Sequence, residues 1–258
     1  MVTSAHDLHH PTAFSEQGFS DPYPDGIERH YWTVARNRTI HRTIQEAVSF
    51  AKPSLVVDVG CGRGITLDYL YERGMEVLGC ELGRANPIST RIAPHLHFDT
   101  DAVSLPQETR RNVGVLLLLD VLEHLPSPSS FLDGLVDAFE KVHTIIVTVP
   151  ARQELWSNYD EHYGHYKRYD FENACELFNP ARFEIRRQSY LFRSLYWPAL
   201  MLKWIGRGRA TSIAAPTGAS VAVHGLMARW LELESRLLPS VVPGTSLMMV
   251  LKPKPVLT

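Results

Sequence analysis

The sequence predicts an α/β protein with a doubly wound, mostly parallel sheet of seven strands and a helical insertion before the last strand. Two observations carry this prediction. Short, continuously apolar runs alternate with helical patterns, as expected when parallel strands are buried on both faces of a sheet. A cluster of glycines directly follows the first apolar run, where a strand would turn into a helix.

The first five strands are expected at the apolar runs between residues 55 and 149. These runs are Leu55 to Val59, Glu76 to Cys80, His95 to Phe98, Val113 to Leu119 and Thr144 to Val149. Helical spacings of apolar residues predict one long helix or two short ones from Ile27 to about Phe50. Further helices are expected from Ile65 to Gly74 and from about Ser129 to Val142.

Two more strands are expected at Phe183 to Gln188 and Leu247 to Leu251, separated by a long segment with two apolar helical patterns. We therefore expect one sheet domain formed by residues 27–190 and 244–258. Residues 1–26 would be a mobile leader with an N-terminal lid helix after it. Residues 191–243 would be a helical insertion, and substrate specificity should lie there.

Composition excludes several classes of protein. The 258 residues are 45% hydrophobic and 21% charged, and 26 basic side chains against 28 acidic ones give a net charge of −2. This balance argues against nucleic acid as a partner. Three widely spaced cysteines argue against a disulfide framework or a zinc site and favour a cytoplasmic location. The polar N-terminus predicts no secretory signal, and no apolar run is long enough to span a membrane.

The glycine cluster VVDVGCGRG contains Gly60, Gly62 and Gly64, and it suits close approach of a ligand to the backbone at a helix N-terminus. A dinucleotide fingerprint that starts at Gly60 requires glycine or alanine where the chain has Ile65. The phosphate-binding P-loop is also excluded, because no Gly-Lys-Ser/Thr follows.

The cluster and three later motifs resemble class I S-adenosylmethionine-dependent methyltransferases of bacterial small-molecule and ubiquinone pathways. The motifs are Asp58 with the glycines, Glu81 after VLGC, Asp101-Ala102 in DTDAVSLP, and LDVLEHLP after the fourth strand. The resemblance covers roughly the first 150 residues. It implies a Rossmann-like methyltransferase fold with S-adenosyl-L-methionine as the cofactor.

The resemblance also assigns the cofactor-binding residues. Glu81 is placed where a carboxylate accepts both ribose hydroxyls in nucleoside-binding α/β folds. Asp101 and the backbone of Ala102 would bind adenine, with Asp99 as an alternative to Asp101. The glycine loop, with Gly60, Cys61, Gly62 and Gly64, would face the amino-acid half of the cofactor, where Asp58 would accept from the ammonium group. Asp120 is also expected to bind the cofactor.

Asp120, Glu123 and His124 follow the fourth strand, at the edge where open α/β sheets bind ligands. His124 is a candidate general base. The three side chains are alternatively a site for a divalent ion, as in the ubiquinone-pathway O-methyltransferases that share the motif. A third interpretation is that Glu123 and His124 only shape the loop. We predict a site without a bound metal ion.

The segment after the fifth strand is dense in polar and aromatic groups and resembles the G-H-x-R-R-Y segment of related bacterial methyltransferases. We expect His165 and Tyr166 to be catalytic and His162 and Arg168 to bind substrate. The alternative for Arg168 is an ion pair with Asp170 or Glu172.

The N-terminal segment IERHYWTVARNRTI also resembles a family pattern, in which an aromatic pair and an arginine precede the first strand. Tyr31, Trp32 and Arg36 would close over the cofactor and bind substrate. The alternative is that the aromatic rings only pack the leading helix on the sheet.

Residues 190–209 combine aromatic and apolar side chains with basic residues toward the end. The pattern fits a helix in a membrane interface, a lid over a lipid-like substrate, or an ordinary helix packed on the sheet or on a second subunit. Peripheral membrane contact is therefore one expectation beside a cytoplasmic location.

Together these features predict an enzyme that transfers a methyl group to an O or N atom of a small-molecule, lipid-linked or glycan-linked acceptor. One rival is an NAD-dependent oxidoreductase on a similar sheet, which Ile65 disfavours. A second rival is a non-catalytic S-adenosylmethionine-binding interaction module.

Overall fold

The computed structural model describes residues 23–47 and 54–254. Most of the expected leader, residues 1–22, lies outside the described residues. The expected helix end at Phe50 and the last four residues also lie outside them.

Seven strands form one sheet in the order β3-β2-β1-β4-β5-β7-β6, which confirms the predicted fold class. Six strands run parallel, and β7 lies antiparallel between β5 and β6. The strands are β1 (Leu55–Val59), β2 (Val77–Cys80), β3 (Leu96–His97), β4 (Val113–Leu119), β5 (Thr144–Pro150), β6 (Phe183–Leu191) and β7 (Ser246–Pro253).

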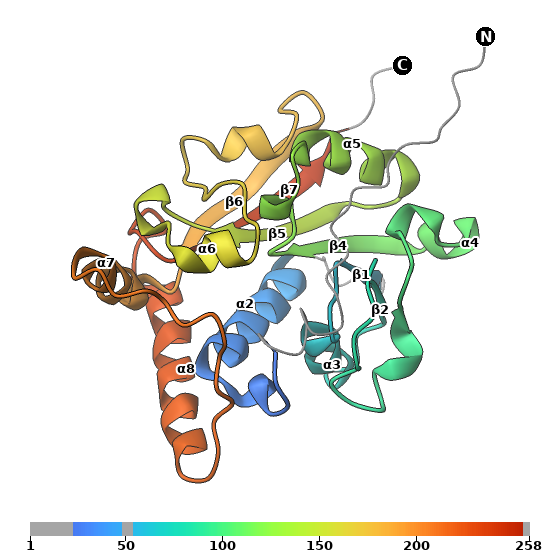
Figure 1. The fold of residues 1–258 in the computed structure, drawn as a ribbon. Coiled ribbons are helices and arrows are strands. Elements are labelled where there is room, and N and C mark those ends of the chain that lie inside the picture. Colours follow the sequence, from blue (N-terminus) through green and yellow to red (C-terminus); the bar gives the residue numbers. More distant parts are fainter. Residues whose placement is uncertain (1–22, 48–53, 255–258) are drawn as a thin grey trace.

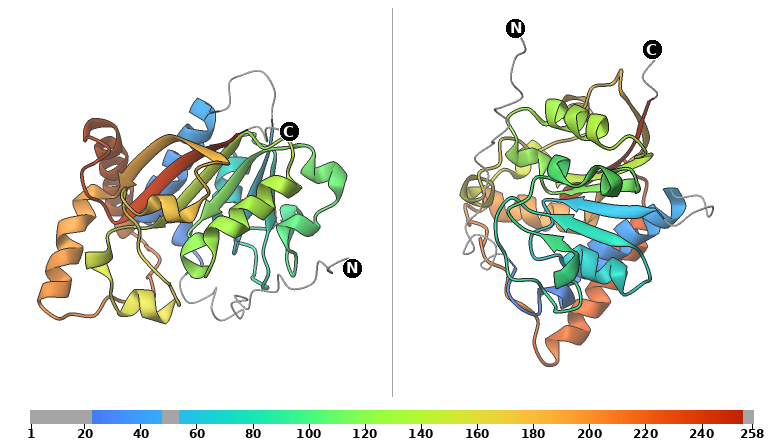
Figure 2. Two further views of the ribbon diagram at one scale, coloured as in Figure 1. Left: turned by 90° about the horizontal axis from the view of Figure 1, so that it is seen from above. Right: turned by 90° about the vertical axis from the view of Figure 1, so that its right-hand side faces the viewer.

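Helices cover both faces of the sheet, so the molecule has three layers (Figures 1 and 2). The helices are α2 (Tyr31–Ala47), α3 (Ile65–Tyr71), α4 (Gln107–Arg110), α5 (Pro128–Ala138), α6 (Asn158–His162), α7 (Tyr196–Trp204) and α8 (Ser220–Leu237). Leu116 of β4 belongs to the apolar cluster that contains Leu132 of α5. The next residue, Leu117, belongs to a second cluster that contains Ile40 of α2 and Leu67 of α3. Neighbouring residues of one strand thus point to opposite faces.

Several predicted boundaries are wrong by a few residues. The single helix α2 starts at Tyr31 after a short 3₁₀ turn over Ile27–Arg29. Helix α5 ends at Ala138 and not at Val142, because Phe139 leaves the helical conformation. Strand β6 extends to Leu191, where it still pairs with Ser246 of β7. The end of β6 is set by its pairing with β7, which the local sequence pattern of β6 does not reveal.

Helices α7 and α8 lie between β6 and β7 in the chain, as the predicted insertion requires. Both lie on the side of the molecule away from β1 and β2 (Figure 1). Among the described residues, no helix has the length and apolarity needed to cross a bilayer. The division of the chain into sheet domain and insertion remains a prediction.

The position of the ligand site follows from the strand order. After β1 the chain builds β2 and β3 on one side, and it then returns to place β4 on the other side of β1. Parallel β1 and β4 pair from Leu55 to Asp58 and from Val113 to Leu117, so their carboxyl ends share one edge. Open α/β sheets bind ligands at such a switch point. Gly60 and Asp120 each follow one of these two strands.

We predict that Leu117→Ala lowers the free energy of unfolding by about 2–5 kcal/mol, because it empties space in a fully buried position of the central strand. Urea unfolding followed by circular dichroism measures the loss. Leu226→Ala, on an exposed helix face, is the control and should change the value by less than about 0.5 kcal/mol. Equal losses for the two variants would contradict the described core.

Candidate active site

A cavity of about 1140 Å³ opens at the carboxyl edge of β1 and β4. The glycine loop, the end of β2, the residues after β4, the loop after β5, helix α2 and helix α7 all contribute to its walls. The elements that the sequence singled out therefore meet around one space.

The glycine loop brings backbone close to this cavity. Gly60 has φ of +78°, and a Cβ added there would lie 2.7 Å from Cγ2 of Val121. Glycine is thus required both by the backbone conformation and by the neighbouring loop. The Asp58 side chain is buried just before the loop, and its Oδ1 has no hydrogen-bond partner among the described residues. Burial raises the pKa of Asp58 to about 7, although nearby Arg36 acts to lower it.

Glu81 lies at the end of β2 with its carboxylate turned toward the glycine loop. It accepts hydrogen bonds from the backbone N–H groups of Gly62, at 3.0 Å, and Gly83, at 3.2 Å. Burial raises the pKa of Glu81, and these two N–H groups act in the opposite direction. A carboxylate has further lone pairs, so Glu81 can still accept from ligand hydroxyls.

Asp101 lines the cavity after β3, where it also accepts a hydrogen bond from the N–H of Val103. The alternative candidate, Asp99, is not among the cavity-lining residues and pairs with exposed Arg84. Of the two candidates, Asp101 is thus the one that lines the cavity.

Arg36 on α2 reaches across the cavity to Asp120. Its Nη1 lies 2.8 Å from Oδ2 of Asp120, whose other oxygen accepts a hydrogen bond from Thr148 of β5. Asp120 has φ of +60°, which is rare for a residue with a side chain. The guanidinium also stacks on the ring of Trp32, 4.8 Å from its centroid. The predicted residues Tyr31, Trp32 and Arg36 all line the cavity.

A short segment before α2 lies over the glycine loop. The guanidinium of Arg63 donates to the backbone oxygen of Tyr23 and, at 2.6 Å, to Asp25. Tyr23 also lines the cavity. This contact could not be predicted from sequence, because Asp25 is 38 residues away from Arg63 of the glycine cluster and only the fold brings the two side chains together.

His165 is held by a buried carboxylate. Its Nδ1 lies 2.9 Å from Oδ1 of Asp160, and Arg168 binds the same carboxylate through Nε at 2.8 Å and Nη2 at 3.0 Å. Burial would raise the pKa of Asp160, but the hydrogen bonds from His165 and Arg168 lower it to about 2. Arg168 is thus in an ion pair, as one interpretation expected. Its partner, however, is Asp160 and neither Asp170 nor Glu172.

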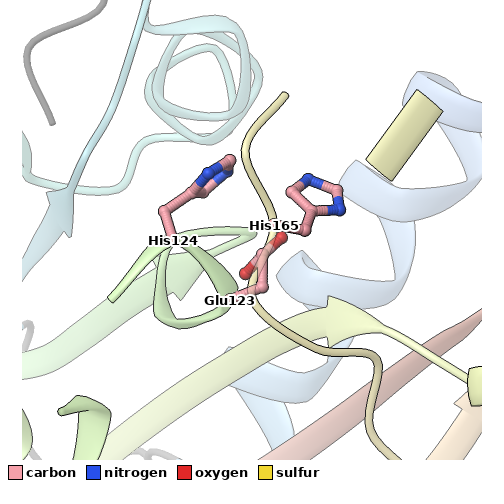
Figure 3. A group of neighbouring side chains, drawn as sticks. All are labelled: Glu123, His124 and His165. Atoms are coloured by element: carbon pink, nitrogen blue, oxygen red, sulfur yellow. The ribbon is translucent and has the colours of Figure 1, made fainter. Parts of the chain in front are cut away.

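Glu123, His124 and His165 surround one small space (Figure 3). Each offers a ligand atom, and these atoms lie within 4.8 Å of one another. Burial and the carboxylate of Asp120 hold the pKa of Glu123 well above its usual range. Burial and the neighbouring His165 lower the pKa of His124 to about 4, so its imidazole is neutral at pH 7. The group differs from the set considered from sequence, because His165 takes the place of Asp120.

Most predicted site residues line the cavity. The cavity-lining ones are Tyr31, Trp32, Arg36, Asp58, Gly60, Cys61, Gly62, Glu81, Asp101, Asp120, His124, His165 and Arg168. Gly64, Ala102, His162 and Tyr166 are not among the lining residues. Tyr166 is 63% exposed, and His162 is exposed too. Asp160 was missed as a functional residue, because only the fold brings it to His165 and Arg168.

Comparison with curated proteins finds relatives in part of the chain. This chain is 35% identical over 96 residues to a protein named ubiquinone biosynthesis O-methyltransferase from Pseudomonas entomophila. The match covers 34% of this chain and 40% of that one. A protein of the same name from Acinetobacter baylyi is 31% identical over 88 residues, covering 30% of this chain and 35% of that one. The match thus spans about two fifths, or less, of these relatives.

Comparison with solved structures supports the fold. Phospholethanolamine N-methyltransferase 2 of Haemonchus contortus, in complex with phosphomonomethylethanolamine and S-adenosylhomocysteine, superimposes with a TM-score of 0.51 at 12% identity. The match covers 96% of this chain and 62% of that one. The family described as "Methyltransferase domain" matches residues 31–188, which is more than half of the chain. The chain therefore belongs to the methyltransferase domain family, as its resemblance to class I S-adenosylmethionine-dependent methyltransferases implied.

Proposed function

We propose that this protein transfers a methyl group from S-adenosylmethionine to a nucleophilic oxygen or nitrogen of a small acceptor, with a hydroxyl oxygen as the better fit. The observation that carries this proposal is a cavity whose lining includes both the glycine loop with Glu81 and the side chains of His124 and His165. The relatives named ubiquinone biosynthesis O-methyltransferase favour an oxygen acceptor.

The cofactor half of the cavity suits S-adenosylmethionine. Glu81 is placed to bind the ribose hydroxyls, and Asp101 to bind the adenine amine. The unpartnered oxygen of buried Asp58 is suited to the ammonium group, and Arg36 to the carboxylate. When bound, the cofactor supplies a methyl group already activated on a sulfonium, so the protein mainly aligns the reactants and excludes water.

The acceptor half is lined by apolar and aromatic groups and has a histidine base. Trp156, Tyr159 and Leu202 form part of this wall. We infer that His165 takes the proton of the acceptor hydroxyl at Nε2, while Asp160 holds Nδ1. Arg168 is then a positioning residue, because its guanidinium is bonded to Asp160 and to the backbone oxygen of Ala151. Exposed Tyr166 and His162 have no part in this proposal.

We expect Glu81→Ala to weaken binding of S-adenosylhomocysteine by about tenfold to a hundredfold. The change removes the carboxylate proposed to bind the ribose, and it leaves the N–H of Gly62 without its partner. Isothermal titration calorimetry measures the dissociation constant, and Glu76→Ala, before β2, is the matched control. Affinity for NAD instead of S-adenosylhomocysteine would contradict the proposal and revive the oxidoreductase interpretation.

Cofactor affinity should rise with pH because of Asp58. Its pKa of about 7 means that the carboxyl is mostly protonated at pH 6 and must lose its proton before it can pair with an ammonium group. Affinity for S-adenosylhomocysteine should therefore increase about fivefold to tenfold between pH 6.0 and 7.5. Asp58→Asn should weaken binding and remove this dependence. If Asp58→Asn keeps the full pH dependence, another group binds the ammonium.

His165→Ala should lower kcat about a hundredfold or more, as expected for loss of a general base, while the affinity for S-adenosylhomocysteine stays within about twofold. Methyl transfer to a hydroxylated aromatic acceptor and calorimetry measure the two quantities. The matched control is His162→Ala on the same loop, which should keep nearly full activity.

A chelator distinguishes a role of His165 as general base from a role as metal ligand. If His165 is the base, EDTA leaves turnover unchanged. Loss of turnover with EDTA and its recovery with Mg²⁺ would instead assign Glu123, His124 and His165 to a metal ion.

A further inference from the structure

The outer sides of α7 and α8 expose many large apolar side chains. On and just after α7 they are Trp197, Met201, Trp204 and Ile205, and Trp204 is 77% exposed. Such a concentration on one side of a molecule is unusual for a surface that meets only water. We call these side chains, with those of α8 described next, the α7/α8 surface.

Helix α8 is apolar on two sides. Ala228 and Leu231 are buried in the core cluster that includes residues of α2. The exposed apolar residues recur at helical spacing along the rest of the helix, at Val223, Leu226, Met227, Trp230, Leu233 and Leu237. Packing in the core explains the first set, whereas the apolar side chains of the second set are exposed on the described surface.

A buried carboxylate ties the two helices together. Glu234 of α8 is 2% exposed and accepts hydrogen bonds from the backbone N–H groups of Arg193, at 2.6 Å, and Ser194, at 2.9 Å. These residues form the turn that leads into α7. The indole N–H of Trp230 also donates to the hydroxyl of Ser194. The two exposed faces are therefore held in a fixed relation to each other.

The same part of the chain is strongly basic. Residues 185–231 contain no aspartate or glutamate, whereas the whole chain has a net charge of −2. Of their basic side chains, Arg193 is buried, and Arg186 and Arg187 of β6 form ion pairs with Glu184 and Glu46. The exposed basic side chains on or between α7 and α8 are Lys203, Arg207, Arg209 and Arg229. Apolar and aromatic groups bordered by arginine and lysine are typical of elements that lie in the interface of a membrane.

We propose that the α7/α8 surface docks on the surface of a bilayer that contains anionic phospholipids. Tryptophan and leucine side chains would enter the boundary between headgroups and acyl chains, and the basic side chains would meet the lipid phosphates. A second copy of the chain fits less well, because a twofold contact would bring this basic segment against itself.

Docking of this kind has a consequence that rests on the proposed function. Helix α7 also lines the active-site cavity, through Pro198, Ala199 and Leu202. One helix would then face both the bilayer and the acceptor half of the cavity. An acceptor carried on a lipid could reach the site without crossing water.

Vesicle flotation with the purified full chain tests the proposal. Vesicles of phosphatidylcholine alone are compared with vesicles of phosphatidylcholine and phosphatidylglycerol at about 3:1, without cofactor or acceptor. We expect partition to be at least tenfold stronger on the anionic vesicles and to fall with added salt. Trp204→Glu and Leu226→Glu should each lower it about tenfold, and Arg229→Glu should lower it severalfold.

Matched controls are Tyr71→Glu and Lys141→Glu, which place the same charge at exposed positions outside α7 and α8. They should float like the wild type. Absence of flotation, equal binding to both kinds of vesicle, or sedimentation as a dimer that Trp204→Glu dissociates would overturn the proposal. Calorimetry with S-adenosylhomocysteine on the same variants should give unchanged affinity, so failure of the docking proposal is distinguishable from failure of the proposed reaction.

Discussion

The parallel pairing of β1 with β4 is the constraint on which the rest of the site depends. It places the ends of both strands at one edge, so the loop that begins at Gly60 and the loop that begins at Asp120 lie side by side. The contact between Gly60 and Val121 is so close that a side chain at residue 60 would separate the loops. Glu81 reaches the same cavity from the end of β2, His124 from the loop after β4, and His165 from the loop after β5.

Buried charge is concentrated at this edge. Asp58, Glu123 and the Arg36–Asp120 pair lie together, and the carboxylates outnumber the arginine. Burial raises the pKa of both Asp58 and Glu123. Their negative charges are therefore not fully balanced by nearby positive charges or by hydrogen bonds. A cationic ligand would supply that compensation. Carboxyl groups are thus buried away from water at the place where a positively charged cofactor is proposed to bind.

Much of the fold could be predicted from sequence, because buried parallel strands form continuous apolar runs and β1 and β4 were predicted at their observed bounds. Part of the cavity could be predicted too, since the lining residues Gly60, Glu81, Asp101 and Asp120 each follow a strand. On the other side of the cavity, His124 and His165 could be predicted from their motifs, but the contacts that position His165 could not. Asp160 reaches His165 and Arg168 only through the turns after β5, and Asp25 meets Arg63 only because the chain before α2 lies over the glycine loop.

The central claim is that one cavity holds the cofactor against the glycine loop and the acceptor against the His124 and His165 wall. A crystal structure of the complex with S-adenosylhomocysteine tests this most directly. We expect the ribose hydroxyls on Glu81, the ammonium on Asp58, and the sulfur facing open space beside His165. A ligand whose sulfur faces away from both histidines, or whose ribose lies outside reach of Glu81, would contradict the account.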